Sequence, residues 1–329
     1  MADGDVVLSF PEDCVSGEEE YVLFRVHKFI LSHNSTTFKT MLDKRLLNKR
    51  TRNLYKGAPV LKLEDSAEDF NNLLEVLYDP TKIPFKKWDP DTPLNIKCIL
   101  LLTDKYHFAS LRKRIVDHIK EDWPATINEW DIVEFAVQTF KRNDPQEALD
   151  NHFPEPGAAI QLARLCNIPE ILPAAFYHLS RLHQNEDWDM CWGSSPDEDT
   201  LEKVAAGKKR TARWGLLTDQ DYRCLVRGRD FLEDALSDTV FPSSILPWTI
   251  PDGMCDNQHH CRSLFPNVLA SMRNDSRRTR DVLAVLDTYA SKDISQEYHL
   301  CLLCGAVLNI SLKALRGSLW TSLPRFFDV

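Results

Sequence analysis

The sequence predicts an α+β domain, in which a small sheet packs with helices, followed by an all-α domain. Short segments at residues 5–10, 21–28 and 58–64 are rich in valine, leucine and aromatic residues, which is typical of β-strands. After the first third of the chain, apolar residues recur at helical spacing almost to the last residue. The length of 329 residues suits two domains, which we place at residues 1–123 and 124–329.

The N-terminal strands are followed by helices. A polar stretch at residues 11–20 separates the first two strands, as the loop of a hairpin would. Residues 36–47 predict a helix with one apolar face, formed by Phe38, Met41, Leu42 and Leu46. Ser66, with Asp69 three residues later, is typical of a helix start. We therefore expect three further helices after the third strand, at residues 70–78, 95–106 and 110–121.

Three segments resemble a BTB/POZ domain: DVVLSF, LFRVHKFILSHNSTTFKTML and PVLKLED. The resemblance covers about the first 120 residues and implies a domain for protein–protein contact, including homodimers or heterodimers. BTB homodimers carry a buried acid and base at the dimer centre, and the matching positions are Asp5 and Lys28. The alternative for these two is an ordinary surface pair at a strand end. The expected contact residues are Asp5, Lys28, Phe29, Phe38, Met41, Leu42 and Leu46.

The resemblance also raises two alternative functions. Many BTB domains recruit a cullin ubiquitin-ligase scaffold through an apolar residue, any residue and then Glu after the second helix. The corresponding residues here are Leu46-Leu47-Asn48, so the carboxylate is missing and the role of a ubiquitin-ligase substrate adaptor is disfavoured. A transcription-associated regulator is the second alternative. The net charge of −9 and the lack of repeated zinc-finger spacing argue against direct nucleic-acid binding.

The second domain is similar to the C-terminal region of a large group of fungal, basidiomycete-type BTB proteins. This resemblance covers residues 155–329 and rests on the segments LARLCNIPEILPAAFYHLSRL, LTDQDYRCLVRGRDFL and WTSLPRFFDV. It implies a helical domain but no biochemical activity. Periodicity predicts its helices at residues 129–140, 158–166, 169–183, 217–236 and 276–290.

Four of the nine cysteines lie in two late pairs: Cys255 and Cys261, then Cys301 and Cys304. Four soft ligands in a tetrahedron suit one structural zinc ion, and His259 or His260 could replace a cysteine. Gly305, directly after the second pair, would permit the positive φ that a zinc knuckle often needs. The alternative is that the second pair forms part of the apolar core of a helix over residues 297–315.

Enzyme motifs are absent from the sequence: it has no G-x-S-x-G, G-x-G-x-x-G, Walker loop or H-E-x-x-H. We therefore expect no catalytic activity, and core or incidental roles for the remaining cysteines, Cys14, Cys98, Cys166, Cys191 and Cys224. The chain shows neither a signal peptide nor an apolar run of membrane-spanning length. These features predict an intracellular protein of the cytoplasm or nucleus, with protein partners and no membrane contact.

Overall fold

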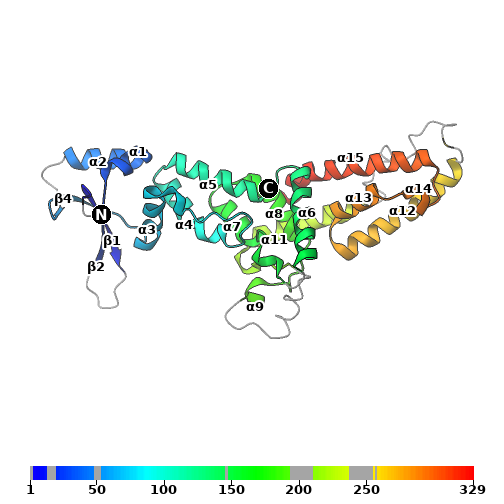
Figure 1. Ribbon diagram of the computed structural model, residues 1–329, viewed down its shortest axis with the longest axis horizontal. Helices are drawn as coiled ribbons and strands as arrows, with labels where there is room; N and C mark the ends of the chain where they lie inside the picture. Colours follow the sequence, from blue (N-terminus) through cyan, green and yellow to red (C-terminus); the bar gives the residue numbers. More distant parts are fainter. Residues whose placement is uncertain are drawn as a thin grey trace. The chain divides into compact units, whose positions relative to one another are not determined.

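The computed structural model describes residues 3–12, 20–47, 53–144, 147–192, 210–236, 255 and 258–329 (Figure 1). The chain divides into two compact units. The first contains Met1–Asp122 together with Arg164–Ile168, and the second contains Trp123–Ala163 together with Pro169–Val329.

The first unit is built on a four-stranded mixed sheet with the order β2-β1-β4-β3. The strands are β1 (Val6–Glu12), β2 (Glu20–Val26), β3 (Leu54–Tyr55) and β4 (Ala58–Lys62). Strand β1 pairs antiparallel with β2 and parallel with β4, so that the most buried strand is central. Its apolar run is buried along almost its whole length, as a strand covered on both faces requires.

Five helices accompany the sheet in the described part of this unit. They are α1 (Lys28–Asn34), α2 (Thr36–Leu47), α3 (Ala67–Tyr78), α4 (Thr92–Lys105) and α5 (Ala109–Asp122), and α3 packs on β1. Ser66 caps α3, and its side chain accepts a hydrogen bond from the backbone N–H of Asp69, as the sequence predicted. The core contains the fully buried rings of Phe10, Phe38 and Phe70, and the ring of Phe70 contacts both of the others.

The second unit is helical. Its helices are α6 (Ile127–Asn143), α7 (Pro156–Leu165), α8 (Leu172–Ser180), α9 (Trp188–Trp192), α11 (Asp219–Asp234), α12 (Gln258–Thr279), α13 (Val282–Ser291), α14 (Ile294–Glu297) and α15 (Leu302–Phe327). Short 3₁₀ turns lie at Leu149–Asn151, Pro169–Ile171 and Trp214–Leu216. Capping boxes begin α6, at Thr126 and Glu129, and α11, at Thr218 and Asp221.

One predicted helix is wrong in its boundaries. The periodicity over residues 276–290 indicated a single helix, whereas the structure ends α12 at Thr279 and starts α13 at Val282. Arg280 adopts a left-handed φ of 55°, which terminates α12. The side chain of Asp281 then accepts a hydrogen bond from the N–H of Ala284 and caps α13.

A buried charged network joins three helices of the second unit. The guanidinium of Arg181, just after α8, lies 2.6 Å from Asp281 and 2.8 Å from Glu134 on α6. The hydroxyl of Tyr177 donates to Asp281 at 2.7 Å. Buried charges are tolerated when they are paired and hydrogen-bonded in this way. The network therefore fixes α6 and α8 against the start of α13.

Helix α15 is the core helix of the second unit. It runs side by side with α13, which in turn packs on α12 (Figure 1), and it also contacts α8 and α11. By length and composition it is the one helix among the described residues that could cross a membrane. However, one face is buried inside the unit, and Arg316 on that face binds the carboxylate of Asp131 on α6.

Candidate functional site

The first unit presents three of the expected contact residues at the start of α1. The ring of Phe29 is 73% exposed and stacks on His33. The backbone N–H of Lys28 donates to Oδ1 of Asp5 at 2.5 Å, so the carboxylate of Asp5 holds the first turn of the helix. The ammonium of Lys28 lies 3.1 Å from Asp43 on α2. The expected acid and base are therefore adjacent, but the ammonium pairs with a different carboxylate.

Two of the expected contact residues lie inside the domain. Phe38 is fully buried and Leu42 is 3% exposed, since the apolar face of α2 packs on the core of its own unit. The structure therefore places both side chains in the core of the unit and not on its surface. Met41 is half-buried. The side chain of Leu46 and residues 48–52, with the place where a cullin-recruiting acid would stand, lie outside the described residues.

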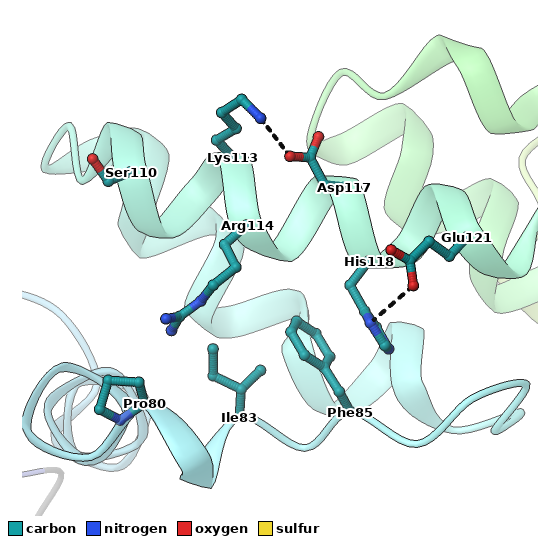
Figure 2. A pocket seen from close by; sticks show the side chains of 9 residues that line it. All are labelled: Pro80, Ile83, Phe85, Ser110, Lys113, Arg114, Asp117, His118 and Glu121. Carbon is teal, nitrogen blue, oxygen red and sulfur yellow. Dashed lines mark hydrogen bonds and ion pairs between the residues drawn. The ribbon is translucent and has the colours of Figure 1, made fainter.

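An open pocket of ≈ 440 Å³ lies on the same unit, between α5 and the segment that follows α3 (Figure 2). His118 stacks on Phe85 with ring centroids 3.8 Å apart, and its Nδ1 lies 3.8 Å from Glu121. Burial lowers the pKa of His118, which favours the neutral imidazole. This pocket was not predicted from the sequence, because its lining comes from two separate segments, residues 80–85 and α5, which share no motif.

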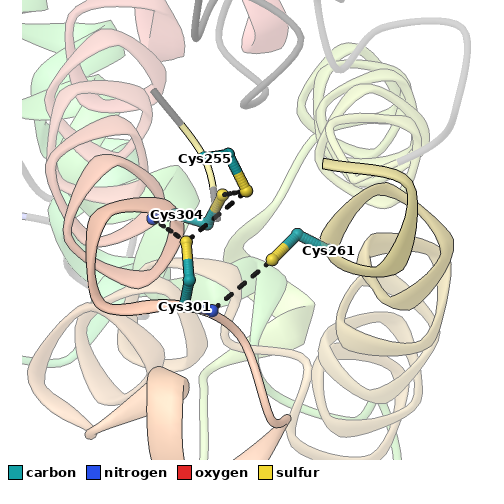
Figure 3. Close-up of side chains that lie close together, drawn as sticks. All are labelled: Cys255, Cys261, Cys301 and Cys304. Carbon is teal, nitrogen blue, oxygen red and sulfur yellow. Dashed lines mark hydrogen bonds between the residues drawn. The ribbon is translucent and has the colours of Figure 1, made fainter. Parts of the chain in front are cut away.

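The second unit brings together four cysteine sulfurs, hereafter the four-cysteine cluster (Figure 3). All four Sγ atoms lie within 4.8 Å of one another. The sulfur of Cys255 is 3.6 Å from that of Cys301 and 3.5 Å from that of Cys304. Cys261 contributes the fourth sulfur from the first turns of α12. The four cysteines named from sequence thus meet at one point, although they are spread over about 50 residues.

The start of α15 positions two members of the cluster. Cys301 is the N-cap of the helix, and its Sγ accepts a hydrogen bond from the backbone N–H of Cys304 at 3.4 Å. The N–H of Cys301 in turn donates to Sγ of Cys261 at 3.4 Å. The helix expected over residues 297–315 therefore starts at Leu302 in the structure, between Cys301 and Cys304. These N–H donors and the positive end of the helix dipole favour sulfur in its thiolate form.

The thiols of the cluster differ in the direction of their pKa shifts. Burial raises the pKa of Cys261 and Cys304. Burial also acts to raise the pKa of Cys301, but the N–H of Cys304 and the neighbouring thiols outweigh it, so that this pKa is lowered. Of these three thiols, Cys301 is therefore the one that loses its proton most readily.

Two sequence expectations around the cluster change. His259 and His260 are exposed on α12 and do not belong to the group of ligand atoms that the described residues bring together. Gly305 lies within α15 and is not among the positive-φ glycines. Its role is close packing instead, since a Cβ at this position would collide with Oγ of Ser295.

The other described cysteines lie apart from the cluster. Burial raises the pKa of Cys98 and Cys191, and it raises the pKa of Cys166 to about 11. Cys224 is buried on α11. These thiols stay protonated at neutral pH where their pKa is raised, which does not suit a nucleophile. Cys14 lies outside the described residues.

Comparison with known proteins gives one family match. Residues 13–122, about a third of the chain, match the BTB/POZ domain. The match ends at the last residue of α5 and so spans most of the first unit. No curated protein matches the chain.

Proposed function

Since residues 13–122 form a BTB/POZ domain, a fold for protein–protein interaction, we propose that the chain acts by pairing with a second copy of itself through this domain. The observation that carries the proposal is the exposed ring of Phe29 beside the Asp5–Lys28 pair at the start of α1. A large aromatic side chain in water is a typical anchor of an interface. The helical second unit would then hold further partners in a two-chain assembly.

The charges around Phe29 suit a two-fold contact. Lys28 is half-buried with its ammonium at the surface, and Asp43 beside it is exposed. In a two-fold interface each residue meets the same patch of the partner, so an acid and a base side by side can pair across the axis. Phe29 would be buried twice, once in each chain. At about 2 kcal/mol for each phenylalanine ring, the two rings contribute roughly 4 kcal/mol.

The test is sedimentation equilibrium of the full chain, with Phe29→Asp as the variant. Loss of roughly 4 kcal/mol corresponds to about a thousandfold weaker self-association. The matched control is Phe135→Asp, because Phe135 on α6 is 69% exposed but belongs to the second unit. We expect two chains per particle for the unchanged protein and the control, and one for Phe29→Asp. A single-chain mass for the unchanged protein at ~10 μM would contradict the homodimer.

A further inference from the structure

The four-cysteine cluster has the dimensions of a metal site. Zinc–sulfur bonds of ~2.3 Å in a tetrahedron place the sulfurs about 3.8 Å apart. The separations of 3.5 and 3.6 Å from Cys255 to its two neighbours, within an overall spread of 4.8 Å, fit this tetrahedron. A disulfide would need two sulfurs at about 2.05 Å, and the cysteines of the cluster are free. The arrangement is therefore that of four converging ligands.

The backbone around the cluster supplies N–H donors to two of the four sulfurs. A thiol is a weak hydrogen-bond donor, so four thiols gain little from meeting at one point. Here two of the sulfurs, those of Cys261 and Cys301, accept backbone N–H groups at the start of α15. Four thiolates without a cation would repel one another. A divalent metal ion bound at the centre removes this repulsion.

We propose that one structural zinc ion binds the four-cysteine cluster. The donor set consists of sulfur alone, which selects a soft or borderline metal over magnesium or calcium. All four tetrahedral positions are taken by protein, so no position is left for a water molecule and the ion is not catalytic. Both zinc and iron accept four thiolates in a tetrahedron. We commit to zinc, and metal analysis distinguishes it from iron.

The ion would fasten three separate parts of the second unit. Cys255 precedes α12, Cys261 lies in its first turns, and Cys301 and Cys304 begin α15. Most of α12 and all of α13 and α14 lie between the two cysteine pairs in the sequence. The ion would link the two ends of this segment. Because α15 supports α8, α11 and α13, the ion would hold the end of the core helix on which the unit is assembled.

The test is metal analysis of the full chain, purified from zinc-containing medium and dialysed, with Cys301→Ser as the variant. The matched control is Cys224→Ser, because Cys224 is a buried cysteine of the same unit outside the cluster. We expect one zinc ion per chain in the unchanged protein and in the control, and loss of most of it in Cys301→Ser. A folded, metal-free chain, or a chain that carries iron instead, would overturn the proposal.

A second measurement separates ligand loss from misfolding. Cobalt(II), added to the unchanged chain after removal of its metal, reports the ligands through its absorption spectrum. We expect the intense visible bands of a tetrahedral ion and the thiolate charge-transfer band of four sulfurs, displaced by one equivalent of zinc. The weak spectrum of an octahedral, oxygen-ligated ion would overturn the assignment even if Cys301→Ser fails to fold.

Discussion

Phe29 and Phe38 differ only in where the fold places them, and this difference predicts opposite behaviour. Phe38 is fully buried against Phe70 and Tyr106, with ring centroids 5.9 and 4.8 Å away. Phe38→Ala removes these contacts and leaves a cavity, which costs about 3–5 kcal/mol of unfolding free energy. Phe29 is 73% exposed, so Phe29→Ala changes the stability of the chain by less than about 0.5 kcal/mol.

The assay is urea unfolding of the two variants, followed by far-UV circular dichroism at a protein concentration low enough to keep the chain dissociated. Phe38→Ala should lower the midpoint of the transition that belongs to the first unit, whereas Phe29→Ala should leave it in place. Phe38→Leu, which keeps most of the apolar volume, should fall between them. Equal losses of unfolding free energy for Phe29→Ala and Phe38→Ala would refute the conclusion that Phe38 lies in the core and Phe29 on a contact surface.

Three further predictions concern stability. Burial raises the pKa of Asp122 to about 6, above its unfolded value near 3.8, so the free energy of unfolding falls as the pH rises from about 3.8 to about 6. Asp122→Asn should match the unchanged chain at about pH 3 and exceed its free energy of unfolding by up to about 3 kcal/mol at pH 7 in urea titrations; no change with pH would contradict this. Arg316→Met should lower the free energy of unfolding by about 2 kcal/mol, because it removes the guanidinium that binds the carboxylate of Asp131. A double-mutant cycle with Asp131→Asn should show that the two losses are coupled, and additive losses would contradict this interaction. Gly157→Ala should lower the melting temperature, since its Cβ would lie 2.6 Å from the backbone oxygen of Arg213; an unchanged melting temperature would show that the backbone yields.

Periodicity and caps made much of the fold predictable. The helix start at Ser66 was identified from the side chain that caps it, because this side chain acts on the nearest turn. The break at Arg280 was missed because apolar spacing continues through it. The end of α12 depends on one left-handed residue, and no glycine or proline marks that position in the sequence.

The candidate sites were predictable to different degrees. The four-cysteine cluster could be proposed from sequence because metal ligands are few in type and stand in recognisable pairs. The contact face could not be resolved, since the apolar spacing of Phe38 and Leu42 is the same for a core face and for an interface. The pocket at His118 could not be found at all, because only the packing of α5 on the segment after α3 brings His118 onto Phe85.

The most direct test of the account is native mass spectrometry of the full chain and of Phe29→Asp over a series of concentrations around ~10 μM. The proposed function predicts a two-chain mass for the unchanged protein and a one-chain mass for the variant. A one-chain mass for both proteins over the whole series would contradict pairing through the BTB/POZ domain.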